Sequence, residues 1–381
     1  MTPKDLFLTV RARTEEICAP LKIEDYVPQP VVFASPPKWH LAHTTWFFEA
    51  FILEKYLDGY SVYDKDFSFL FNSYYNTVGE RTFRADRGNI TRPSVEEVFA
   101  YRKYVDEAMM KLLQSGDNDF EKVLLIGLNH EQQHQELLIT DLKYTLGHNP
   151  LFPVYDADTD LTNSTNEASG FVKIEEGVFE IGHHGDEFCF DNELGRHKVY
   201  IHEFEISNSL VTNGEFIEFI EAGGYSSFQY WLDEGWAWVN ENGIESPLYW
   251  YKINGEWHHY TLAGLKKVDP NKVLAHISFY EASAFAFWNG MRLPTEFEWE
   301  VAADKLDWGV RWEWTNSAYL PYPNFKIASG ALGEYNGKFM VNQMVLRGGS
   351  TATAEGHSRK TYRNFFHPHY QWQYTGIRLA K

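Results

Sequence analysis

A polar segment near the middle of the chain separates two halves with different sequence patterns. Residues 156–170 (DADTDLTNSTNEASG) contain four acidic residues, no basic residue and one large apolar residue, Leu161. Such a segment has little apolar surface to bury, so it predicts an inter-domain linker. We therefore expect an N-terminal domain at residues 1–155, a linker at 156–170 and a C-terminal domain at 171–381.

The N-terminal half carries helical periodicity and helix-capping signals. Thr2 followed by Pro3 is typical of a helix start, and Ser94 with Glu97 forms a capping box before another helix. The expected helices begin near Thr2, Ser35, Ser94 and Phe120, and the last of them ends at Gly147. Because one longer connection at residues 58–93 joins them, they predict a four-helix bundle.

The C-terminal half has short alternating runs with many Gly and Trp residues between them. Residues 171–174 and 199–204 alternate between apolar and polar side chains, as strands do. Helical patterns occur at residues 213–222 and 278–289. The pattern predicts an irregular α+β domain, so the whole chain is expected to be a multidomain protein with one all-α and one α+β part.

Composition and charge narrow the classes of partner. The 381 residues carry a formal charge of −19, which disfavours binding to nucleic acid and to anionic membranes. The two cysteines exclude a disulfide framework and favour a reducing compartment. No apolar leader and no run of 18 apolar residues occurs. We expect a cytoplasmic protein that acts on small molecules, and the sequence leaves open whether it forms a homo-oligomer.

The sharpest chemical signal is a histidine pair in the last N-terminal helix. His130 and His134 are four residues apart, so both imidazoles leave the same face of the helix and can reach one metal ion. The alternative is a pair of solvated histidines in a polar turn. The run HEQQH also matches the zinc-peptidase pattern, with Glu131 as the base. Glu136 is about 200° round the helix from His134 and is a poor candidate ligand.

A third histidine ligand is available in the second helix, which contains His40 and His43. His43 shares a stripe with Trp39 and Trp46 that should face the bundle interior, whereas His40 lies about 100° from Trp39. A single histidine at such a position is more often a core residue with satisfied hydrogen bonds. The helical phase alone leaves the choice between the two open.

These residues, together with several longer motifs, resemble the sulfoxide synthases of ergothioneine biosynthesis. The N-terminal half resembles their DinB-like domain, and the C-terminal half resembles their formylglycine-generating-enzyme-like domain, a fold related to C-type lectins. The motifs that carry the resemblance are residues 35–49 (SPPKWHLAHTTWFFE), 70–76 (LFNSYYN), 130–136 (HEQQHQE), 191–193 (DNE), 211–213 (VTN), 292–300 (RLPTEFEWE), 346–350 (LRGGS) and 376–379 (GIRL), with Gly182.

The resemblance implies an iron(II) site and an oxygen-dependent reaction. It maps the family's iron ligands to His43, His130 and His134. Three neutral imidazoles leave positions on Fe(II) for a substrate thiolate, a substrate imidazole and dioxygen. The implied reaction joins the sulfur of L-cysteine to C2 of the hercynine imidazole and transfers one oxygen atom to that sulfur. Cofactor and substrates would be Fe(II), hercynine, L-cysteine and O2.

The resemblance also implies the residues that surround the iron. Tyr74 and Tyr75 match a tyrosine pair that can donate a proton to reduced oxygen, and Arg84 and Arg87 match arginines that hold the carboxylate of the thiol substrate. The residues implied for hercynine binding are Gln133, Asn364, Phe365 and Phe366. Aromatic faces suit the quaternary ammonium of hercynine. Without the family, a packing role for the tyrosines and phenylalanines and surface pairing of the arginines remain the alternatives.

Two features of the sequence bear on which thiol is used. Phe366 stands where the branch that uses γ-glutamylcysteine has an aspartate, and that branch takes its tyrosine from the second domain instead of from a pair such as Tyr74 and Tyr75. Both features favour free cysteine. Sister reactions remain alternatives, with γ-glutamylcysteine, a selenosugar or unmethylated histidine as a substrate.

Two other classes are further alternatives. One is a DinB-like zinc or nickel thiol transferase, which needs no oxygen. The other is a non-catalytic binding protein with a lectin-like module. Copper-dependent formylglycine formation is excluded, because the paired C-terminal cysteines that it requires are missing.

Overall fold

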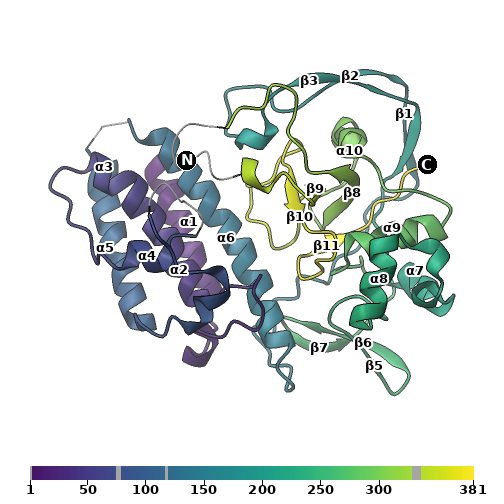
Figure 1. Ribbon diagram of the computed structural model, residues 1–381, viewed down its shortest axis with the longest axis horizontal. Helices are drawn as coiled ribbons and strands as arrows, with labels where there is room; N and C mark the ends of the chain where they lie inside the picture. The colour runs from purple at the N-terminus through teal and green to yellow at the C-terminus, as the bar shows by residue number, and fades with distance from the viewer. Residues whose placement is uncertain (1, 74–78, 116–118, 328–335) are drawn as a thin grey trace. The chain divides into compact units, whose positions relative to one another are not determined.

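The computed structural model describes residues 2–73, 79–115, 119–327 and 336–381 (Figure 1). The chain forms two compact units. The first extends to Asp156 and also includes the short segment Ala352–His357 from the C-terminal half, and the second holds Ala157–Ala328, Tyr335–Thr351 and Ser358–Lys381. As Figure 1 shows by colour, helices form the N-terminal part of the chain and all strands lie in the C-terminal part.

The first unit is built from helices whose starts follow the capping signals. Thr2 caps the first helix and Ser94 caps the fifth, as predicted, and each of them forms a complete capping box. Within the described residues the helices are α1 (Pro3–Cys18), α2 (Pro37–Phe48), α3 (Glu54–Tyr56), α4 (Phe67–Phe71), α5 (Val95–Leu113) and α6 (Glu121–Gly147). The long helices α1, α2, α5 and α6 pack against one another as a bundle.

Helix α2 is the central helix of this bundle, and all of its residues are buried. It packs against α1, α4, α5 and α6, so no side of it faces solvent. The prediction of a single interior stripe was therefore wrong: His40, expected away from the interior, is 2% exposed. A helix that packs against neighbours on all sides has no solvent-exposed face, so its buried residues do not form a single stripe.

Helix α2 is followed directly by a π-helical segment at Glu49–Leu53. The wider turn shifts the helical phase after Phe48, which a uniform 3.6-residue period does not anticipate. The buried Glu49 carboxylate accepts hydrogen bonds from the hydroxyls of Tyr60 (2.5 Å) and Tyr101 (2.6 Å). These bonds tie the segment to α5 and to the connection that follows.

The second unit contains small sheets and short helices. Its strands are β1 (Phe171–Ile174), β2 (Gly177–Ile181), β3 (His197–Ile201), β4 (Phe204–Ser207), β5 (Trp250–Ile253), β6 (Glu256–Thr261), β7 (Gly264–Lys267), β8 (Trp312–Ala318), β9 (Met344–Gly348), β10 (Asn364–Phe366) and β11 (Thr375–Gly376). Its helices are α7 (Asn213–Glu221), α8 (Asp233–Asn242), α9 (Phe279–Trp288) and α10 (Glu296–Ala302). Helices α7 and α9 and strand β1 occupy the ranges that their patterns predict.

The strands pair mostly antiparallel, in the orders β1–β4, β2–β3, β5–β6–β7 and β10–β9–β8–β11, and only β8 and β11 pair parallel within the described residues. The run at 199–204, predicted from its alternation as strand, is divided: β3 ends at Ile201 and pairs with β2, whereas β4 starts at Phe204 and pairs with β1. Ile174, Ile201 and Phe204 bury together in a core cluster beneath these pairs.

Several residues of the family motifs form a buried ionic framework in the second unit. Arg347 binds Glu296 and Glu300, and Arg378 binds Glu313 through two hydrogen bonds of 2.6 and 2.8 Å. Each of these arginine side chains is fully buried, and a buried charge without its partner is strongly destabilising. These motif residues therefore hold the fold of the second unit together.

The segment predicted as a linker has neither helix nor strand in residues 157–170. Its chain is nevertheless held to the second unit. Arg311 is fully buried and donates to the carbonyls of Leu161 (3.2 Å) and Thr162 (3.1 Å), and Asp160 pairs with Lys266. Among the described residues, no helix has the length and apolar character needed to cross a membrane.

Candidate metal centre

Three histidines of the helical unit converge in its interior. One ring nitrogen from each of His43, His130 and His134 lies within 4.8 Å of the other two. His43 comes from α2, and the other two come from consecutive turns of α6. The Nε2 atoms of His43 and His130 are 3.1 Å apart. Two ligands at right angles, each about 2.1 Å from one ion, have a separation of about 3 Å, so this spacing fits a shared metal ion.

The close approach of the two helices explains the convergence. A Cβ atom at Gly127 of α6 would lie 2.8 Å from ring atoms of Phe47 and Phe48 of α2. Only glycine allows the helices to pack at this distance, and His130 follows Gly127 by one turn on the same face. The ring of His43 is also held in place, because it stacks on Trp39 with 4.4 Å between centroids.

Burial keeps these imidazoles uncharged. Desolvation lowers the pKa of His130 from 6.5 to about 3, and it lowers the pKa of His43 and His134 well below the same value. The neighbouring histidines lower the last two further. Neutral imidazole is the form that binds a metal, so the cluster needs no proton release at neutral pH. Imidazole nitrogen suits iron, zinc, copper and nickel.

Hydrogen bonds at the far side of two rings fix which nitrogen faces inward. His43 Nδ1 donates to the main-chain carbonyl of Phe71 at 2.6 Å, which leaves the lone pair on Nε2. His134 Nδ1 lies 2.9 Å from Nδ1 of His40, and His40 Nε2 lies 3.1 Å from the carboxylate of Asp141. Partners of this kind orient metal-binding histidines in many proteins.

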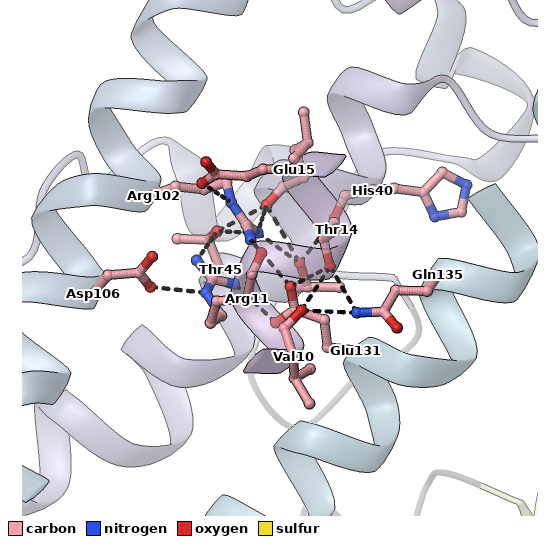
Figure 2. Close-up of polar contacts among 12 residues, drawn as sticks. Val10, Arg11, Thr14, Glu15, His40, Thr45, Arg102, Asp106, Glu131 and Gln135 are labelled. Carbon is pink, nitrogen blue, oxygen red and sulfur yellow. Dashed lines mark hydrogen bonds and ion pairs between the residues drawn. The ribbon is translucent and has the colours of Figure 1, made fainter. Parts of the chain in front are cut away.

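Glu131 does not belong to the histidine cluster. Its carboxylate is fully buried and binds Arg11 Nη1 (2.9 Å), Arg102 Nη2 (3.1 Å) and the hydroxyl of Thr14 (2.7 Å). Figure 2 shows this network among α1, α5 and α6, with the ring of His40 outside it. Burial alone would raise the pKa of Glu131, but the two arginines hold it below its ordinary value. The carboxylate is thus a structural anion, and the arrangement lacks the base of a zinc peptidase.

The two arginines predicted for substrate binding differ in burial and in their hydrogen-bond partners. Arg87 is buried: its guanidinium lies 3.4 Å from the centroid of the Trp39 ring, and it donates to the hydroxyl of Ser35 at 2.8 Å. Because Trp39 also stacks on His43, a single ring separates Arg87 from a candidate ligand. Arg84 is exposed and donates to the carbonyl of Phe33.

Helix α6 also presents polar residues beside the histidines. Gln133 is half-buried on this helix. Thr353 donates to the carboxylate of Glu136 at 2.9 Å, and Nδ1 of His357 lies 3.3 Å from the side-chain oxygen of Gln132. The segment Ala352–His357, which comes from the C-terminal half of the chain, therefore packs on the helix that carries His130 and His134.

The remaining predicted residues are Tyr74 and Tyr75, which fall outside the described residues, and Asn364, Phe365 and Phe366, which form β10 of the second unit. There the ring of Phe365 stacks on Tyr319 at 4.0 Å, and the ring of Phe366 meets Trp372 edge-on at 5.1 Å.

Sequence reasoning missed His40 and Asp141 as partners of the cluster. Asp141 follows His134 by seven residues, which places both on one face of α6, so the signal was present in the spacing. His40 was considered only as the other candidate ligand beside His43.

Both units match known domain families. Residues 6–138 match the DinB superfamily, and residues 157–309 match the sulfatase-modifying factor enzyme 1-like domain. A helical bundle with a three-histidine cluster, followed by an α+β unit of this kind, is the two-domain arrangement that the sequence motifs predicted.

Similar proteins narrow the class further. Hercynine oxygenase of Mycolicibacterium smegmatis is 28% identical over 353 residues, which cover 78% of this chain and 80% of that protein. Hercynine oxygenase of Mycolicibacterium thermoresistibile is 29% identical over 306 residues, which cover 66% of this chain and 67% of that protein. Formylglycine-generating enzyme of Thermomonospora curvata is 32% identical over 182 residues, which cover only 43% of this chain and 58% of that enzyme. Over most of its length the chain is thus similar to the hercynine oxygenases, and its two matched domain families agree with the resemblance to the sulfoxide synthases of ergothioneine biosynthesis.

Proposed function

We propose that this protein is an iron(II)- and dioxygen-dependent sulfoxide synthase that joins L-cysteine to C2 of hercynine. The observation that carries the proposal is the cluster of His43, His130 and His134, found in a chain that is similar to the hercynine oxygenases. In the proposed reaction a carbon–sulfur bond replaces the C2–H bond and the S–H bond. One atom of dioxygen goes to sulfur and the other, with the two hydrogens, to water, so atoms and electrons balance.

The three histidines would hold the metal through their inward-facing nitrogens. The set contains no carboxylate, so a divalent ion would keep its full charge. A ferrous ion there would supply the Lewis acidity that lowers the pKa of a substrate thiol, and it would relay electrons from the substrates to dioxygen. The apolar walls formed by Trp39 and Phe47 would exclude water from the reacting groups.

Arg87 is the better of the two candidates for the carboxylate of cysteine. Its guanidinium is already oriented by Trp39 and Ser35, and a planar guanidinium binds a carboxylate through two hydrogen bonds. Arg84, which is exposed, would contribute to binding of the same carboxylate. The hydroxyl of Tyr74 or of Tyr75 is proposed to donate a proton to reduced oxygen, which favours sulfoxide formation over simple oxidation of the thiol.

The residues proposed for hercynine are those that the family resemblance implies. Gln133, next to His134, and Asn364 are proposed to hydrogen-bond its polar groups, and Phe365 and Phe366 to face its trimethylammonium group. The preference for free cysteine over γ-glutamylcysteine depends on Phe366 and on the tyrosine pair.

The deciding experiment is an anaerobic reconstitution with Fe(II), hercynine and either cysteine or γ-glutamylcysteine, followed by admission of oxygen and mass analysis. We expect hercynyl-cysteine sulfoxide, with cysteine the better thiol. If sulfoxide formed only from γ-glutamylcysteine, the proposed reaction type would stand, but the thiol substrate would be γ-glutamylcysteine and not cysteine. Thiol transfer without oxygen consumption would instead identify a metal-dependent thiol transferase.

A further inference from the structure

Behind the candidate ligand His134 lies a chain of two buried side chains. His40 and Asp141 are each 2% exposed. The distance from His134 Nδ1 to His40 Nδ1 is 2.9 Å, and the distance from His40 Nε2 to Asp141 Oδ2 is 3.1 Å. The same carboxylate oxygen accepts the main-chain N–H of Ser35 at 2.7 Å. The three side chains thus form one continuous hydrogen-bonded row.

The chemistry of these groups determines which atom donates and which accepts in each hydrogen bond of the row. A carboxylate only accepts, so His40 Nε2 must carry the hydrogen that it donates to Asp141. A neutral His40 then has its lone pair on Nδ1, and the hydrogen between the two rings must come from His134 Nδ1. The remaining nitrogen of His134, Nε2, is left with a lone pair. That is the tautomer in which Nε2 of His134 can bind a metal ion.

The row also joins the two helices that carry the ligands. His40 precedes His43 by almost one turn of α2, and Asp141 follows His134 by two turns of α6. Through Ser35, Asp141 also holds the residues at the start of α2. Rotation of the His134 ring, or of either helix about its axis, would break at least one of these hydrogen bonds.

We infer that His40 and Asp141 are positioning residues that fix the tautomer and the ring orientation of His134 for metal binding. The inference rests on the metal role that the proposed function gives to the three histidines. It does not depend on which substrates the enzyme uses. His40 acts through His134 and touches neither the metal nor a substrate.

The test compares two replacements of His40 in the full-length protein. His40→Leu removes both hydrogen bonds, whereas the amide of His40→Gln can accept from His134 Nδ1 and donate to Asp141. Cobalt(II) is the probe, titrated into metal-free protein against a competing chelator and followed by its visible spectrum. We expect His40→Leu to bind Co(II) about 10–100-fold more weakly than wild type, and His40→Gln to remain within about threefold.

Stability measured on the same variants separates positioning from folding. His40→Leu takes one hydrogen-bond partner away from the buried carboxylate of Asp141, so unfolding by urea should show a loss of stability in this variant that His40→Gln does not share. A loss of stability alone therefore must be shown not to weaken metal binding. Asp106→Asn is the matched control, because Asp106 pairs with Arg11 in the same bundle and not with a histidine. It should lose stability and keep the affinity for Co(II).

A direct readout covers the case in which His40→Leu does not fold. In metal-free wild-type protein labelled with ¹⁵N-histidine, His134 should show the tautomer with hydrogen on Nδ1, identified by the loss of its signals in His134→Gln. Hydrogen on Nε2 would overturn the inference, as would unchanged Co(II) affinity in His40→Leu or equal weakening in both folded variants. If these results hold but iron-loaded protein forms no sulfoxide from hercynine, the proposed reaction fails and the positioning role stands.

Discussion

Glu131 and Arg11 form a buried ion pair of 2.9 Å, which places the carboxylate next to His130 in the bundle core and outside the histidine cluster. In a zinc peptidase the same sequence pattern places a base beside the metal. Here the arginines of α1 and α5 form ion pairs with the carboxylate instead, and these ion pairs fix the rotation of α6 about its axis.

Glu131→Gln should therefore destabilise the fold without abolishing metal binding. Removing one partner of a buried ion pair leaves Arg11 and Arg102 without their shared anion, which costs about 3–5 kcal/mol. Urea unfolding measures this loss, and metal analysis of the folded variant should show wild-type content. Normal stability would contradict the structural role, and a folded variant without metal would contradict the separation of Glu131 from the histidine cluster.

His134→Ala should remove the metal. Loss of an outer partner already costs about 10–100-fold in affinity, so loss of a ligand should cost more than about 100-fold. Iron content after anaerobic loading measures the effect. His148→Ala is the control, since His148 is an exposed residue at the end of the same helix and lies outside the cluster. Normal iron content in His134→Ala would rule out this ligand set.

Tyr74→Phe or Tyr75→Phe should divert the product from the sulfoxide to oxidised cysteine. Without a phenol that donates a proton to reduced oxygen, thiol oxidation competes better with carbon–sulfur bond formation. The ratio of the two products by mass analysis is the measurement. Tyr200→Phe, which changes an exposed tyrosine of β3, should keep the wild-type ratio. If both single variants also keep that ratio, neither tyrosine donates the proton.

Phe366→Asp should weaken the use of free cysteine. The substitution adds a negative charge where the protein now has an aromatic ring against Trp372, and like charges repel the carboxylate of cysteine. We expect kcat/KM for cysteine to fall by about tenfold, equivalent to about 1.4 kcal/mol. Phe228→Asp, at an exposed position of the second unit, should change nothing. Unchanged cysteine kinetics in Phe366→Asp would remove Phe366 as a reason to assign the thiol.

Local features of the fold could be predicted from the sequence, and features that depend on distant contacts could not. The capping boxes at Thr2 and Ser94 are complete within four residues, so their helices start where expected. Trp312 pairs in parallel with Thr375, which lies more than sixty positions further along the chain, and no local pattern indicates this pairing. Likewise, nothing in residues 157–170 indicates that Arg311 will bind their carbonyls.

The candidate site shows the same division. The pair His130 and His134 follows from helical spacing alone. The choice of His43 over His40 came from the resemblance, because α2 is buried on every side and its helical phase does not separate an inner face from an outer one. The role of Glu131 was hidden for the same reason: its partners are on α1 and α5, far away in the chain.

The stability of the metal-free protein should fall as the pH is lowered through the ordinary pKa of histidine. Burial lowers the pKa of His130 from 6.5 to about 3, so between these values the unfolded chain binds a proton at this residue and the folded chain does not. The free energy of unfolding then decreases by about 1.4 kcal/mol per pH unit for His130 alone, between about pH 6 and about pH 4. Above pH 6.5 both states are neutral at this residue, so its contribution no longer changes.

Urea unfolding in the presence of a chelator, at about pH 7, 6 and 5, measures this slope. His43 and His134 should add to it, because their pKa values are also lowered by burial. His130→Gln removes one of the groups, so its slope should be smaller than that of wild type by about 1.4 kcal/mol per pH unit. Equal slopes for the two proteins would mean that His130 is protonated in the folded state. In that case protons would compete with the metal for this ligand, and the cluster would not be ready to bind an ion at neutral pH.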